Sequence, residues 1–187
     1  MIQPCGTNPL IPAMSQHDRL FGSTDAPIVL MQYGDYECPR SGQIFLWIKQ
    51  LEAELRDSIL FVFRHFPQTH LHPQAQKAAE IAEAAATQNQ FWQMHTLLCQ
   101  NSQALADADL VEYAVQLRLD VPQLLSELAD RVHRDRIQND LHSAQQLGIQ
   151  ATPTFFVGIC CQPNQEVKTL LKAILHALPL YTQELNL

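Results

Sequence analysis

The spacing of apolar residues divides the chain into segments of different character. Residues 28–33 (Ile-Val-Leu-Met-Gln-Tyr) form a nearly continuous apolar run, as in a parallel strand buried on both faces. Gly34 and Asp35 end this run, and a helical pattern begins at Pro39. The apolar positions of that helix share one face: Ile44, Trp47, Ile48, Leu51 and Leu55. Residues 58–63 (Ser-Ile-Leu-Phe-Val-Phe) are rich in β-forming side chains and predict a second strand.

Residues 73–147 predict a block of helices. An alanine-rich segment at 78–86 favours one helix, and residues 91–98 (Phe-Trp-Gln-Met-His-Thr-Leu-Leu) suggest the next. The expected helix boundaries are Asp107 and Asp120 as N-caps, Pro122 in a first turn, and Gly148 after the last turn.

Strand character returns near the end of the chain. Residues 154–157 (Thr-Phe-Phe-Val) predict a strand, Gly158 a turn, and residues 160–162 a return strand. A final helix would present the apolar positions Val167, Leu170, Leu171, Ile174, Leu175 and Leu178. The order is therefore β-α-β, a helical block, and β-β-α, which predicts an α/β fold. The first β-α-β unit should have parallel strands and a right-handed crossover.

Length and charge narrow the function classes. The 187 residues fit one domain with a large insertion, and such a chain needs no disulfide or metal for stability. The net charge of −7 disfavours binding to nucleic acid or to anionic membranes. Residues 1–20 lack a basic region followed by an apolar one, so we expect no signal peptide and a cytoplasmic protein. The odd number of cysteines, 5, also favours a reducing compartment.

Cys38 is the strongest candidate for chemistry. It stands between a predicted strand and a predicted helix, with Pro39 in the first helical position. The N–H groups of a helix N-terminus favour a thiolate, and Arg40 adds positive charge, whereas Glu37 opposes it. A buried and inert cysteine is the alternative. The surrounding pattern favours a reactive thiol.

Ser41 occupies the position about one helical turn after Cys38. Its hydroxyl could donate a hydrogen bond to a thiolate, or it could be an ordinary first-turn serine, but it cannot form a disulfide. Release of a mixed disulfide on Cys38 therefore needs an outside thiol or another cysteine of the chain. The strand from Thr154 to Val157 would carry the chain roughly 10–13 Å from its start, so Cys160 and Cys161 would be too far for direct attack if Pro153 lies beside Cys38. Cys5 is a somewhat better candidate, and Cys99 is expected in the core.

Two further segments carry candidate residues. Pro153, between Thr152 and Thr154, cannot donate to a strand ladder, so it should stand at a strand start or a special turn. His65, His70 and His72 follow the second strand and would open at the same sheet edge as Cys38. Their spacing matches no metal motif, so we expect solvated histidines and no metal site.

Several motifs together resemble the DsbA-like branch of the thioredoxin superfamily. They occur in order as Tyr33-Gly34-Asp35-Tyr36-Glu37-Cys38-Pro39, Arg64-His65-Phe66-Pro67, His72-Pro73-x-Ala75, Phe91-Trp92-x-Met94-His95 and Thr152-Pro153-Thr154-Phe155-Phe156. The resemblance covers about residues 22–178. It implies a thioredoxin fold with an inserted helical domain, Cys38 as the attacking thiol, and a cis Pro153 facing it. It also implies that Thr152 offers backbone hydrogen bonds to an extended substrate, with Pro39 and Arg40 beside it.

The resemblance sets the expected domains and the expected chemistry. Residues 1–21 would be a tail, 22–67 and 149–180 the thioredoxin-like domain, and 68–148 the helical insertion. The family pattern Cys-x-x-Cys is replaced here by Cys-Pro-Arg-Ser, so Cys38 and Ser41 suggest a monothiol oxidoreductase.

Its expected substrates are protein or peptide disulfides, with no bound cofactor and glutathione as a co-substrate. The alternatives are a kappa-like glutathione transferase or isomerase, in which the Ser41 hydroxyl would stabilise bound glutathione, and a non-catalytic peptide-binding module.

Overall fold

The computed structural model describes residues 11–55, 58–159 and 165–181. Its centre is a four-stranded sheet in the order β1-β3-β2-β4, with β1 at Arg19–Gly22, β2 at Ile28–Gly34, β3 at Ile59–His65 and β4 at Thr154–Ile159. Strands β2 and β3 are parallel, whereas β1 pairs antiparallel with β3 and β4 antiparallel with β2. Helix α1 (Pro39–Leu55) connects the two parallel strands, which confirms the predicted parallel unit.

Alternate side chains of the central strands enter two separate cores. Leu30, Phe61 and Phe63 pack with residues of α1, the helical insertion and α7 (Gln165–Tyr181). Val29, Met31 and Val62 project to the other face and pack with Ala144 of α6 (Arg134–Gln146). Every residue of β2 and β3 is therefore buried, which explains their nearly continuous apolar sequence.

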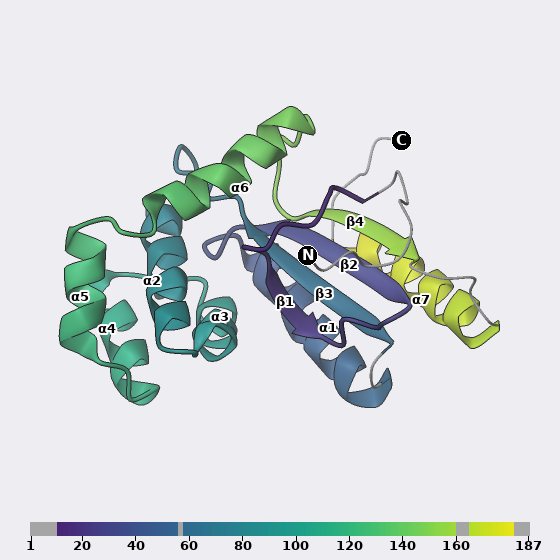
Figure 1. Cartoon of the computed structure of the whole chain (residues 1–187), viewed down its shortest axis with the longest axis horizontal. Coiled ribbons are helices and arrows are strands. Elements are labelled where there is room, and N and C mark those ends of the chain that lie inside the picture. Colours follow the sequence, from purple (N-terminus) through teal and green to yellow (C-terminus); the bar gives the residue numbers. More distant parts are fainter. Residues whose placement is uncertain (1–10, 56–57, 160–164, 182–187) are drawn as a thin grey trace.

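The helical insertion lies to one side of the sheet (Figure 1). It consists of α2 (Ala75–Thr87), α3 (Phe91–Gln100), α4 (Asp107–Gln116), α5 (Val121–Ala129) and α6. Helix α6 leads back across β3 toward the start of β4. Within the described part of the chain, no helix is both long and apolar enough to span a membrane.

Helix α6 ends in a hydrogen-bonded turn that directs the chain toward the sheet. Gly148 has a φ of +70°, a conformation that glycine adopts without steric cost. Its N–H donates to Gln145 O at 3.0 Å, and Ile149 N–H donates to Ala144 O at 3.0 Å. This is the Schellman arrangement, and it confirms the predicted role of Gly148 after the last turn.

Four predictions about strands and helices need correction. Gly158 forms no turn, because it lies within β4 and pairs with Val29 of β2. A tail through residue 21 is wrong at its end, because Arg19–Gly22 form β1, whose main chain pairs with β3. The second strand begins one residue later and ends two residues later than predicted, at His65. The N-cap of α4 is Ala106 rather than Asp107, and Asp109 accepts its backbone N–H. Asp120 is confirmed as the cap of α5, because its side chain accepts from Gln123 N–H.

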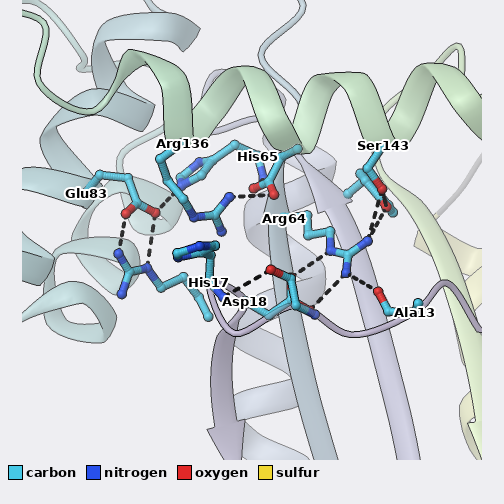
Figure 2. A network of polar contacts seen from close by, with 12 residues as sticks. Ala13, His17, Asp18, Arg64, His65, Glu83, Arg136 and Ser143 are labelled. Carbon is cyan, nitrogen blue, oxygen red and sulfur yellow. Dashed lines mark hydrogen bonds and ion pairs between the residues drawn. The ribbon is translucent and has the colours of Figure 1, made fainter. Parts of the chain in front are cut away.

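Ion pairs join the sheet, the N-terminal segment and the insertion (Figure 2). We call this set the ionic network; it comprises Asp18, Arg19, Arg64, His65, Glu83, Arg136 and Asp140. Glu83 of α2 pairs with Arg19 and with His65. Burial alone would raise the pKa of Glu83, but its hydrogen bonds from His65 and Arg19 lower it well below the ordinary value. Glu83 is therefore a buried carboxylate with two cationic or hydrogen-bonding partners.

Candidate active site

Cys38 stands where the chain turns from β2 into α1. The Cys38 N–H donates to Asp35 O at 3.2 Å, and the Ser41 N–H donates to Cys38 O at 3.0 Å. The Asp35 side chain stabilises the turn because its Oδ1 accepts from Glu37 N–H at 2.9 Å. We call residues Asp35–Cys38 the reactive turn. Its geometry places Cys38 immediately before the first residue of α1, as the sequence predicted.

Cys38 lies against the segment that precedes β4. Its Sγ–H donates to the carbonyl oxygen of Thr152 at 3.6 Å, and the residue is 7% exposed. The Thr152–Pro153 peptide bond is cis, and Pro153 is buried. Thr154, the first residue of β4, pairs with Tyr33 near the end of β2. The fold thus brings together two segments separated by more than a hundred residues in the sequence.

A second layer of hydrogen bonds connects the reactive turn to the Thr152 segment. Asp35 Oδ2 accepts from the backbone N–H of Gln68 at 2.9 Å and contacts His72 Nδ1 at 2.8 Å. The Gln68 side chain reaches in the other direction. Its Oε1 accepts from Thr152 Oγ1 at 2.8 Å, and its Nε2 donates to Gln150 O at 3.1 Å.

Ser41 is buried in the first turn of α1, at 3% exposure. Its Oγ accepts a hydrogen bond from Asp35 N–H at 3.3 Å, and its carbonyl oxygen accepts from Gln32 Nε2 at 3.2 Å. Between these described side chains, no hydrogen bond joins the Ser41 hydroxyl to Cys38 Sγ. Ser41 therefore stabilises the backbone of the reactive turn. Pro39 is exposed and Arg40 is half-buried beside it.

Tyr36 of the reactive turn belongs to an uncharged aromatic cluster. The hydroxyl of Tyr36 and Nδ1 of His95 are 2.7 Å apart, and His95 packs against the rings of Phe45 and Phe63. Burial raises the pKa of Tyr36 well above its ordinary value and lowers the pKa of His95 well below its own. Both side chains are consequently neutral near pH 7.

The other predicted candidates are distributed through the structure. The expectation of solvated histidines is wrong for His65, which is buried and pairs with Glu83. His72 is half-buried and pairs with Asp35, and His70 is exposed. Among the residues described, no three His, Cys, Asp or Glu side chains converge as metal ligands. Cys99 is buried in α3, and burial raises the pKa of its thiol strongly. Cys5, Cys160, Cys161 and the predicted return strand at 160–162 lie outside the described residues.

Sequence reasoning missed Gln68 and Gly42. A Cβ atom on Gly42 would lie 2.5 Å from the carbonyl oxygen of Cys99, so glycine allows α1 and α3 to pack closely beside the reactive turn. The sequence did carry a signal for Gly42, because a glycine in the first turn of a helix is unfavourable unless the packing requires it. Gln68 gave no signal, because a glutamine in a loop is common and its contacts come from distant segments.

The fold and the site define a thioredoxin-like class of protein. A sequence model described as Thioredoxin matches residues 14–175, and the chain belongs to this family. The predicted α/β thioredoxin fold with a helical insertion is confirmed by this match and by solved structures of the same class.

Two solved structures illustrate the likeness. A thioredoxin-like oxidoreductase from Silicibacter pomeroyi is 22% identical, with a TM-score of 0.71 over 88% of this chain and 94% of that one. The α-DsbA1 protein of Wolbachia pipientis is also 22% identical, with a TM-score of 0.69 over 92% of this chain and 95% of that one. At this identity the likeness establishes a shared thioredoxin-like fold.

A curated relative is closer in sequence but much longer. The Na(+)/H(+) antiporter NhaA 3 of Salinispora tropica is 41% identical over 148 residues, which are 79% of this chain and 22% of that protein. The chain thus spans about a fifth of the length of this relative.

Proposed function

We propose that this protein is a monothiol oxidoreductase that exchanges protein or peptide disulfides through Cys38. The observation that carries the proposal is the contact between Cys38 Sγ and the Thr152 carbonyl, at the N-terminus of α1 and beside Pro153. A helix N-terminus favours the thiolate that attacks disulfides, and backbone groups beside it suit an extended peptide. The solved relatives of this fold include thiol–disulfide exchange proteins, which supports the same chemistry here.

The first step is attack of the Cys38 thiolate on one sulfur of a substrate disulfide. A bond forms between Cys38 Sγ and that sulfur, the substrate S–S bond breaks, and the second sulfur leaves as a thiolate that takes up a proton. Ser41 offers no thiol for the second step. An external thiol such as glutathione then attacks the mixed disulfide, regenerates the Cys38 thiol and carries away the substrate sulfur in a new disulfide.

Cys99 does not suit the second step. It is the other cysteine within the described ranges, and it is 7% exposed in α3. Burial raises the pKa of its thiol, so very little thiolate is present at neutral pH. This supports an external thiol as the group that completes the cycle.

The test is turnover of a peptide glutathione-mixed disulfide by wild type, Cys38→Ala and Cys99→Ala. We expect loss of turnover in Cys38→Ala and retention in Cys99→Ala. The release rate of a preformed Cys38–peptide mixed disulfide should rise in proportion to the glutathione concentration. Release that is independent of added thiol, or turnover that survives Cys38→Ala, would contradict the proposal.

The burial of Cys38 favours a second candidate, a peptide-binding module without turnover. A thiol that is 7% exposed needs some local movement before a substrate sulfur can reach it. This alternative predicts that a disulfide-free peptide binds equally well to wild type and Cys38→Ala, with no exchange by either protein. The transferase alternative requires a hydroxyl that faces glutathione, whereas the Ser41 hydroxyl is buried against Asp35 N–H.

A further inference from the structure

Gln68 links the reactive turn with the segment that receives Cys38. Its backbone is fixed on one side, because its N–H donates to Asp35 Oδ2 at 2.9 Å and its carbonyl oxygen accepts from Leu71 N–H and His72 N–H at 2.8 and 2.9 Å. The residue is 9% exposed. A side chain that begins from such an anchored backbone can hold a distant segment in place.

The orientation of the Gln68 amide follows from its partners. The carbonyl oxygen of Gln150 can only accept, so the atom that faces it at 3.1 Å must be the Nε2 donor. Oε1 therefore faces Thr152 and accepts from its hydroxyl at 2.8 Å. Both polar ends of this buried amide are satisfied by one short segment, residues 150–152.

We propose that Gln68 is a positioning residue that holds Thr152 in the arrangement that Cys38 and a peptide substrate require. This inference rests on the proposed function for its catalytic meaning. Thr152 is half-buried, and its carbonyl oxygen is the acceptor of Cys38 Sγ–H. An extended substrate that pairs with this segment binds more tightly when the segment is already ordered, because the cost of ordering it is not paid on binding.

The neighbouring polar residues do not supply a second hydrogen bond to Thr152 in place of the Gln68 side chain. The Asp35 carboxylate accepts from the backbone N–H groups of Glu37 and Gln68 and contacts the ring of His72, and the Ser41 hydroxyl accepts from Asp35 N–H. Among the described residues, the Gln68 side chain is thus the direct polar connection between the loop after β3 and the Thr152 hydroxyl. Loss of the Gln68 side chain should release residues 150–152 without removing any group that reacts.

The kinetic test compares wild type, Gln68→Ala, Thr152→Val and the double variant with a peptide glutathione-mixed disulfide as the probe. Both single substitutions remove the hydrogen bond between Gln68 and Thr152, and Gln68→Ala also removes the one to Gln150 O. We expect KM to rise about 5- to 10-fold in each. The double variant should resemble the single variants, because interacting residues give non-additive effects. In Gln68→Ala, the value of kcat and the rate with a small aromatic disulfide should stay within about 2-fold of wild type.

Gln145→Ala is the matched control, since Gln145 lies exposed on α6 and undergoes the same chemical change. It should leave KM unaltered. Equal KM values in wild type and Gln68→Ala, or fully additive effects of Gln68→Ala and Thr152→Val, would overturn the inference.

Hydrogen exchange measured by mass spectrometry tests the positioning without any turnover. Exchange in residues 150–154 should be faster in Gln68→Ala than in wild type and in Gln145→Ala, while exchange in β2 stays the same. Unchanged exchange in residues 150–154 overturns the inference even if the protein is active. If wild type shows no turnover, the proposed function fails, and the exchange comparison still decides whether Gln68 positions this segment.

Discussion

The reactive turn and the ionic network both connect the helical insertion to the sheet, but they do so with different chemistry. In the ionic network, Arg64 makes five hydrogen bonds, as many as a guanidinium has N–H groups. Its partners include Asp18, Ser143 of α6 and the carbonyl oxygen of Ala13 (Figure 2). Each donor of this guanidinium has a partner supplied by the protein itself.

The reactive turn is held by hydrogen bonds to the single carboxylate of Asp35 and by the amide of Gln68, around one exchangeable contact. Asp35 and Gln68 fix the two neighbouring segments, but Cys38 Sγ meets the Thr152 carbonyl at 3.6 Å, in a weak thiol hydrogen bond. A substrate can replace this contact without leaving a buried charge unpaired. The comparison teaches that two regions have separate tasks. The ion pairs of the ionic network stabilise the scaffold, whereas the reactive turn keeps one weak contact that a substrate can replace.

Arg64→Met should give the largest loss of stability. It leaves Asp18, whose side chain is 1% exposed, without its buried partner, and breaking such a pair typically costs about 3–5 kcal/mol. Urea unfolding followed by tryptophan fluorescence measures this loss. Arg64→Lys should recover only part of it, because an ammonium group has three donors instead of five.

The comparison also predicts what Arg64→Met should leave unchanged. Without urea, where the variant is folded, the rate at which Cys38 reacts with a small disulfide should match the rate in wild type. A variant that stays as stable as wild type, or one that folds but loses Cys38 reactivity, would show that the two regions are not separate in function.

Gly42→Ala should give the next largest loss of stability and should also affect the reactive turn. The new Cβ would lie 2.5 Å from Cys99 O and 3.1 Å from Cys99 Cα, so the backbones of α1 and α3 must move apart. Such overpacking costs about 1–3 kcal/mol, and the higher helix propensity of alanine recovers up to about 1 kcal/mol of it. The matched control is Gln43→Ala, at an exposed position of the same turn, which should be neutral.

The movement of α1 should also slow disulfide exchange, because Cys38 immediately precedes this helix. Exchange rates and urea unfolding of Gly42→Ala and Gln43→Ala measure both effects. Wild-type stability in Gly42→Ala would mean that the helices tolerate the extra methyl group, and the close approach would then have no energetic role.

Gly42 also illustrates what the sequence could not predict. The order of strands and helices follows from local periodicity, so residues 28–33, the helix from Pro39 and the helices of the insertion were predictable from neighbours in the chain. The contact between Gly42 and Cys99 depends on how closely α1 and α3 approach each other, and the local sequence does not determine that distance. The short edge strand β1 was missed for a similar reason, because its four residues are defined by pairing with β3.

The site was predictable only in part. Cys38 was recognisable from a strand, a turn and a helix start, and its placement near Thr152 and Pro153 was implied by the family resemblance. The Gln68 connection was not predictable, because it joins segments 84 positions apart through side-chain geometry. The buried position of the Ser41 hydroxyl against Asp35 likewise depends on the folded turn.

His95→Gln tests the uncharged aromatic cluster that contains Tyr36 through pH dependence. In the unfolded chain a histidine takes up a proton near its ordinary pKa of 6.5, whereas burial lowers the pKa of His95 well below this value in the folded protein. The unfolded state therefore binds more protons below pH 6.5, and stability is lost as the pH falls.

Between pH 7.5 and 5.5 this one group should account for about 1 kcal/mol of lost stability. Urea unfolding of wild type and His95→Gln at both pH values isolates its share, since the other histidines are common to both proteins. His95→Gln should lose less stability on acidification than wild type. An identical loss in the two proteins would mean that His95 is not the group responsible.

Lys77→Met should have the smallest effect, and it sharpens the contrast with Arg64→Met. Lys77 of α2 pairs with Asp107 of α4, but the two side chains are 43% and 77% exposed, so water solvates both charges in the folded protein. Exposed pairs of this kind contribute about 0–1 kcal/mol, and removal of one partner leaves no buried charge behind. Both substitutions replace a cation with methionine, so their difference in urea unfolding reports burial rather than charge. A loss in Lys77→Met comparable to that in Arg64→Met would contradict the view that burial makes the ionic network a structural feature.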